Sequence, residues 1–217
     1  MQSTADAVLV LVLLINLFVL GSSRIRTIIY SVAAHGIILS VLPTLFHGGL
    51  GWRELIVSLG ALLLKGVTIP RMLLRAMADL PIRREIEPIV GFKASLMLGA
   101  LATAASIYLS TRLPLSDVAG SQGGGRMLVA ASFSTVLTGF LLLTTRMKAI
   151  TQVLGYLVLE NGIFIFGILM LRATPFLVEV GVLLDLFVAI FVMGIIINHI
   201  SREFTSISTE HLSALKD

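Results

Sequence analysis

About seven stretches of this sequence are apolar over nearly the ~20 residues that a helix needs to cross a lipid bilayer. A membrane-spanning segment must satisfy its backbone hydrogen bonds internally, and a helix does this within a single segment. The sequence therefore predicts an all-α integral membrane protein with about seven transmembrane helices. The expected spans are 5–22, 25–46, 54–76, 88–110, 127–145, 149–171 and 175–199.

The overall composition agrees with this class. Of the 217 residues, 57% are hydrophobic and 13% are charged, and the mean hydropathy is +1.01; soluble domains carry roughly 25% charged residues. The chain has no cysteine, which excludes thiolate-held iron–sulfur clusters, thiol catalysis and disulfides within it. The net charge of +4 comes from Lys and Arg between the apolar runs, a pattern typical of membrane topology rather than of nucleic-acid binding.

The distribution of basic residues predicts the orientation. They are more numerous on one side of the predicted helices, and the positive-inside tendency assigns that side to the cytoplasm. The amino terminus is then outside, and the polar tail 200–217 is cytoplasmic. The first span follows "MQSTADA", which has no basic residue, so we expect a retained helix rather than a cleaved leader. The predicted cytoplasmic side carries Arg24, Arg26, Arg71, Arg75, Arg83, Arg84, Arg146, Lys148, Arg202 and Lys216, against Arg53, Arg112, Arg126 and Arg172 on the other side.

The segment "GYLVLENGIFIFG", residues 155–167, carries Glu160 at the centre of an apolar run. An ionisable carboxyl at this depth is expensive, so a chain that keeps one usually uses it. Lys148, Gln152, Tyr156 and Glu160 recur at every fourth residue and fall on one helix face, with Asn161 beside Glu160. We interpret them as a polar ladder for proton exchange. The alternative is a glutamate that only hydrogen-bonds a neighbouring helix.

The last expected span, 175–199, contains two acids. Asp185 lies near its middle and Glu179 about a turn from its predicted outer end. At 3.6 residues per turn the two positions are about 240° apart, so they face different neighbours. Asp185 is predicted to be a relay acid, whereas Glu179 is either a relay acid or an interfacial residue in the first helical turn.

The span 54–76 places Lys65 at mid-depth and Pro70 shortly after it. Proline lacks the amide that would otherwise bond the carbonyl of Gly66, which interrupts the helix beside the lysine. Burial and a nearby carboxylate act in opposite directions on an ammonium group, so Lys65 is predicted to load and release a proton as its partner's charge changes. The alternatives are a lysine that extends to the headgroups or closes a static ion pair.

The span 25–46 aligns Thr27, Ser31 and His35 on one face, ending at mid-depth. Histidine has the unperturbed pKa nearest neutrality, which makes His35 a candidate for the proton path. A neutral histidine bonded to a backbone carbonyl would give the same pattern. Both interpretations stay open from sequence alone.

Residues 127–199, with basic "TRMK" before an acid-bearing helix, resemble the three-helix K-type subunit of respiratory complex I and the small C-type subunit of multisubunit cation/proton antiporters. The whole chain, with a four-helix region 1–126 ahead of that module and the segment "QVLGYLVLENGIFIFG", is similar to hydrogenase-4 component E. This family belongs to formate hydrogenlyase-type complexes with a nickel–iron hydrogenase. The resemblance implies antiporter-like subunits and the hydrogenase membrane anchor as partners.

The resemblance also implies a function. We expect a multi-pass, non-catalytic subunit of an oxidoreductase complex in the inner (cytoplasmic) membrane, in contact with lipid and with no nucleic acid. Nickel–iron and iron–sulfur centres are expected in the partner subunits, and no cofactor or metal in this one. Its buried charges would contribute to a path for protons or another cation. A purely structural scaffold subunit and an independent ion-coupled transporter are the alternatives.

Overall fold

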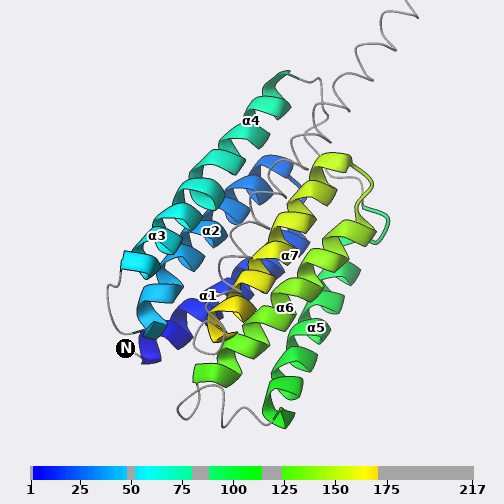
Figure 1. The fold of residues 1–217 in the computed structure, drawn as a ribbon. Coiled ribbons are helices and arrows are strands. Elements are labelled where there is room, and N and C mark those ends of the chain that lie inside the picture. The colour runs from blue at the N-terminus through cyan, green and yellow to red at the C-terminus, as the bar shows by residue number, and fades with distance from the viewer. Residues whose placement is uncertain (1, 48–51, 80–87, 114–123, 171–217) are drawn as a thin grey trace, which may run out of the picture.

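The computed structural model describes residues 2–47, 52–79, 88–113 and 124–170, and these residues form a bundle of helices (Figure 1). Within these ranges there is no β-strand, and an isolated β-bridge joins Pro88 to Arg146. The helices are α1 (Gln2–Gly21), α2 (Ile25–His47), α3 (Trp52–Ala61), the π-helix η1 (Leu62–Thr68), α4 (Ile69–Asp79), α5 (Phe92–Arg112), α6 (Gly124–Thr145) and α7 (Ala149–Met170).

Five of the described helices, α1, α2, α5, α6 and α7, are long and apolar enough to cross a membrane. They correspond to five of the expected spans, and the all-helical class is confirmed for the described residues. The expected span 54–76 consists of three consecutive helical segments, α3, η1 and α4. The span 175–199 lies outside the described residues. The orientation of the termini remains a prediction.

The span expected at 88–110 begins later, because residues 88–91 are not helical and α5 starts at Phe92. Pro88 cannot donate a backbone hydrogen bond, and the amide of Ile89 donates to the carbonyl of Thr145 at 2.9 Å. The chain entering α5 is therefore attached to the end of α6 before the helix starts.

Helices α6 and α7 form the most extensive contact of the bundle, and α1 and α2 pack beside them (Figure 1). The α6–α7 contact is close because glycines lie in it. A Cβ at Gly139 would lie 2.6 Å from the Cα of Leu159, and one at Gly155 would lie 2.8 Å from the Cβ of Leu142. Small residues allow helix backbones to approach in this way inside membranes.

Helix α5 covers one side of this centre and contacts α1 and α6. Its buried residues are small, Ser95, Gly99, Ser106 and Ser110. Its large apolar side chains, such as Met97 and Leu101, point away from the bundle and are 68% and 64% exposed. This arrangement suits a helix that packs tightly inward and meets lipid or another membrane protein outward.

The opposite side is covered by α3, η1 and α4, which pack against α2 (Figure 1). Leu73 and Met77 of α4 join the apolar core, whereas Arg71 and Arg75 are exposed on its other face. Residues 52–79 are helical throughout, and at 1.5 Å per residue they extend about 42 Å, more than the ~30 Å of a bilayer core. The segment η1, which carries Lys65, lies in its middle part.

Candidate functional site: a buried lysine–glutamate pair

Glu160 lies in the middle of α7 and faces the interior of the bundle. Its side chain is 3% exposed, and the neighbouring Asn161 is 2% exposed. Gly162, one residue further on, lies against the backbone of α6, where an added Cβ would be 2.6 Å from the amide nitrogen of Val136. The close α6–α7 packing therefore keeps this polar segment away from the bundle surface.

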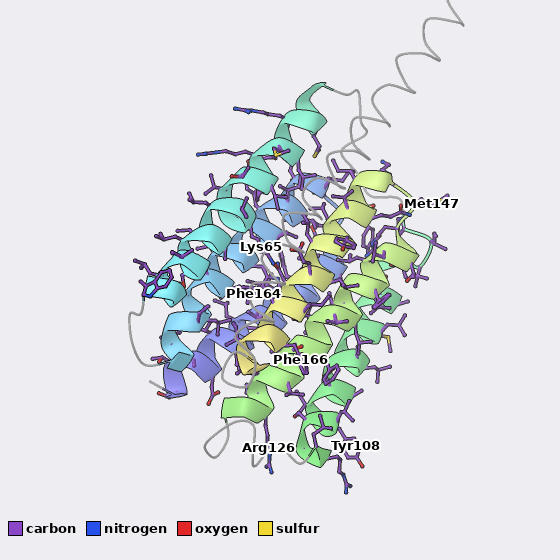
Figure 2. The ribbon with its side chains drawn as sticks, viewed as in Figure 1. Lys65, Tyr108, Arg126, Met147, Phe164 and Phe166 are labelled. Atoms are coloured by element: carbon purple, nitrogen blue, oxygen red, sulfur yellow. The ribbon has the colours of Figure 1, made fainter. Side chains whose placement is uncertain are left out.

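Lys65 from η1 reaches Glu160. The distance from Lys65 Nζ to Glu160 Oε1 is 3.3 Å, and the two side chains are 4% and 3% exposed. The same ammonium lies 5.0 Å from the ring centroid of Phe164 (Figure 2). Glu160 and Phe164 are one helical turn apart on α7, so one face of that helix provides both a carboxylate and an aromatic ring for the cation.

The helix that carries Lys65 has a widened backbone register. Residues Leu62–Thr68 are π-helical, and the amide of Ile69 donates to the carbonyl of Leu64, five residues back. The hydroxyl of Thr68 donates to the carbonyl of Leu63 at 2.8 Å. Pro70 follows directly and has no amide to donate, so it cannot restore the ordinary register. Single π turns of this kind often accompany functional sites.

His35 of α2 belongs to the same region. It is 1% exposed, and its Nε2 has no hydrogen-bond partner among the described residues. Its neighbour Gly36 lies directly against the backbone of Lys65, and the lysine charge acts on the imidazole. Ser31 instead donates to the carbonyl of Thr27 at 2.9 Å, within its own helix. Of the three polar residues predicted to share this face, His35 is therefore the one associated with the buried pair.

The other members of the predicted ladder lie toward the start of α7. Tyr156 is half-buried and packs against the apolar core, and Lys148 is partly exposed just before the helix. Gln152 is exposed, and its Nε2 donates to the carbonyl of Arg146 at 3.1 Å. This bond supports the α6–α7 turn. The proton-conducting role of the ladder remains a prediction. Asp185 and Glu179 lie outside the described residues.

Arg146 is a buried cation that the sequence pattern did not reveal. The sequence pattern places it in the loop between two expected spans, but it is fully buried between helix ends. Its guanidinium donates to the carbonyl of Leu20 at 2.8 Å and to that of Val90 at 3.4 Å, and lies 4.9 Å from the ring of Phe92. Burial lowers the pKa of this guanidinium from its ordinary value, but an arginine remains protonated. Only the shortness of the loop between the spans 127–145 and 149–171 hinted at this position.

Neutral polar pairs connect the helices on the other side of the bundle. Asn16 of α1 donates to the hydroxyl of Thr135 of α6 at 2.8 Å, and both residues are buried. The hydroxyls of Thr103 in α5 and Ser134 in α6 lie 2.8 Å apart. The sequence analysis did not predict these partners.

The geometry thus combines one buried ion pair with a buried imidazole on three adjacent elements, α7, η1 and α2. These groups can gain or lose protons, and charge changes at one of them alter the others. Among the described residues, no group of three or more His, Cys, Asp or Glu is arranged to hold a metal ion. The contact that the structure shows at this site is the electrostatic attraction between Lys65 and Glu160.

The chain is similar over most of its length to several known proteins. Over 209 residues it is 25% identical to hydrogenase-4 component E of Escherichia coli, and the match covers 95% of this chain and 94% of that protein. The chain is a distant relative of hydrogenase-4 component E. The component E of Shigella flexneri matches to the same extent. An uncharacterized protein of Mycobacterium tuberculosis is 29% identical over 206 residues, which cover 94% of this chain and 92% of that protein.

The similarity to hydrogenase-4 component E confirms the resemblance inferred from the sequence, at a distant level. No family model and no solved structure matches the chain. The likeness of residues 127–199 to K-type and C-type subunits, and the division at residue 126, therefore stay predictions.

Proposed function

We propose that this chain is a membrane subunit of a hydrogenase complex and that its Lys65–Glu160 pair forms part of a path for protons or another cation. The 3.3 Å contact between two almost fully buried, oppositely charged side chains carries the proposal. Support also comes from the distant relationship to hydrogenase-4 component E and from five helices suited to a membrane. Ionisable groups at such depth are costly and usually functional.

A proton arriving at Glu160 would neutralise the carboxylate and weaken its attraction for Lys65. A buried ammonium without its carboxylate partner is energetically unfavourable, so Lys65 would transfer its proton to a neighbouring group. His35, on which the Lys65 charge acts, is a candidate for this exchange among the described residues. Asp185 and Glu179 are further candidates from the sequence. The protons of such a set are shared, so it titrates as a group.

The proposed complex lies in the inner membrane. Its partners would be antiporter-like membrane subunits and the membrane anchor of the hydrogenase, with lipid around the exposed apolar faces. Nickel–iron and iron–sulfur centres would belong to those partners, and this chain would bind no redox cofactor. It would then be a non-catalytic subunit that affects coupling rather than electron transfer.

The decisive experiment is Glu160→Gln, which keeps size and hydrogen bonding but removes titration. We expect an assembled complex with normal hydrogenase activity and reduced proton uptake by inverted membrane vesicles, followed with a fluorescent pH-gradient probe. Asp6→Asn is the matched control, since Asp6 lies in the first turns of α1, far from the middle of that helix. Full proton uptake by Glu160→Gln would refute the proton path.

A scaffold role is the second candidate, and the direct contact of Lys65 with Glu160 favours it, because a closed ion pair can specify assembly. The exchange variant Lys65→Glu with Glu160→Lys separates the two roles. A scaffold requires only opposite charges, so the exchange variant would assemble and support full proton uptake. A proton path needs each group in its own surroundings, so the exchange variant would assemble but translocate poorly.

A further inference from the structure

We infer that Gly36 and Gly66 are positioning residues that hold Lys65 within reach of Glu160. The inference rests on the proposed function in that it names the residues that maintain the pair. Neither glycine contacts the carboxylate, and both lie where α2 meets η1.

The approach of η1 to α2 is close at Lys65 itself. A Cβ at position 36 would lie 2.8 Å from the Cβ of Lys65, 2.9 Å from its carbonyl carbon and 3.0 Å from its carbonyl oxygen. Two of these atoms belong to the backbone of η1, so no side-chain rotation can make room. Any larger residue at position 36 must push the backbone of Lys65 away from α2.

Gly66 makes the matching approach from η1. A Cβ at this position would lie 2.8 Å from Cγ1 of Ile37, the residue after Gly36. This neighbour is a side chain that is 44% exposed, so it can be shortened without opening the core. The two glycines and the two residues facing them thus form a reciprocal contact between α2 and η1.

Helix α2 packs against both η1 and α7, so it is the common support for the two members of the pair. A lysine side chain that is 4% exposed and lies 3.3 Å from a carboxylate has little freedom to compensate for a displaced backbone. Moving η1 outward would therefore lengthen the Nζ–Oε1 distance. The π-helical register of Leu62–Thr68 provides the backbone shape that fits against Gly36.

The first test is a stability cycle on the full chain in mixed micelles, measured as the SDS concentration at half-unfolding. Gly36→Ala and Glu160→Gln are each expected to lower this midpoint, and the double variant should lower it by less than the sum, because both remove the same pair. Gly60→Ala, where an added Cβ meets nothing within 4 Å, is the control and should combine additively with Glu160→Gln. Additive losses for Gly36→Ala would overturn the inference.

The second test is a rescue experiment in the assembled complex. It does not use Gly36→Ala, so it can be carried out even if that variant fails to fold. Gly66→Ala should reduce proton uptake by inverted vesicles toward the level of Lys65→Met. Adding Ile37→Ala removes the atom that the new methyl group meets and should restore uptake. Equal uptake by Gly66→Ala and Gly60→Ala would refute the positioning role.

The two tests separate this inference from the proposed function. Suppose that Lys65→Met and Glu160→Gln both leave proton uptake intact. The proton path is then wrong, while the stability cycle still decides whether Gly36 positions the pair. If uptake depends on Lys65 and Glu160 but neither glycine variant behaves as expected, the positioning inference alone fails.

Discussion

The side of the bundle formed by α2, η1 and α7 differs from the side formed by α1, α5 and α6 in how its buried polar groups are paired. The first side holds a full positive and a full negative charge, Lys65 and Glu160, at 3.3 Å. The second holds neutral groups, with Asn16 bonded to Thr135 and Thr103 bonded to Ser134, each at 2.8 Å.

This difference separates two uses of polarity inside a membrane. Neutral hydrogen bonds between helices are worth about 0.6 kcal/mol on average, so they adjust packing at low cost. Removing one partner of a buried ion pair costs several times more free energy than losing such a hydrogen bond, because the remaining charge is not solvated by water. The charged side is therefore the side that we propose to respond to the arrival or loss of one proton, whereas the neutral side would remain unchanged.

Lys65→Met is expected to have the largest effect, because it leaves Glu160 buried without its cation. The free energy of unfolding should fall by about 3–5 kcal/mol when measured by SDS titration in mixed micelles. The double variant Lys65→Met with Glu160→Leu should recover much of this loss, since neither charge of the pair remains. A double variant as unstable as the single one would show that packing around Lys65, rather than its charge, determines stability on this side.

Arg146→Met is expected to have an intermediate effect. It removes the donors to the carbonyls of Leu20 and Val90, and a hydrogen bond to a charged group is worth about 1.5–3 kcal/mol. The same SDS titration measures the loss. Arg126→Met is the matched control, because Arg126 is exposed near the start of α6 (Figure 2) and should change the midpoint little. Equal effects of the two substitutions would argue against a structural role for Arg146.

Asn16→Leu is expected to have the smallest effect, about 0.6 kcal/mol, because it removes one neutral bond to Thr135. Proton uptake by the complex should not change. Thr144→Val, which removes an exposed hydroxyl bonded to its own helix, is the control. If Asn16→Leu abolished uptake or matched Lys65→Met in stability, the distinction between the charged and neutral sides would be wrong.

Much of the helical framework could be predicted from the sequence, because a run of apolar residues of membrane length has few other structures available. The end of α6 at Thr145 and the limits of α7 agree with the expected spans within a residue. Lys65 and Glu160 could be singled out as exceptional for the same reason. An ionisable residue in the middle of an apolar run stands out without knowledge of its neighbours.

The contact between Lys65 and Glu160 could not be predicted, because it depends on how η1 is placed against α2. That placement depends on Gly36, whose role is visible only when the facing atoms of Lys65 are known. Pro70 indicated a disturbed helix, because proline has no amide to donate. The same proline is compatible with an ordinary kink and with a π-helical register, and the sequence does not distinguish the two. The burial of Arg146 likewise depends on three chain segments that are far apart along the chain.

The Arg146 contacts also set an order for biosynthesis. Synthesis proceeds from the amino terminus, so the carbonyl groups of Leu20 and Val90 leave the ribosome well before the arginine that binds them. These two carbonyl groups cannot bind the guanidinium until Arg146 itself has been synthesised. The contacts that join the end of α1 to the segment before α5 through Arg146 can therefore form only after α6 has been synthesised.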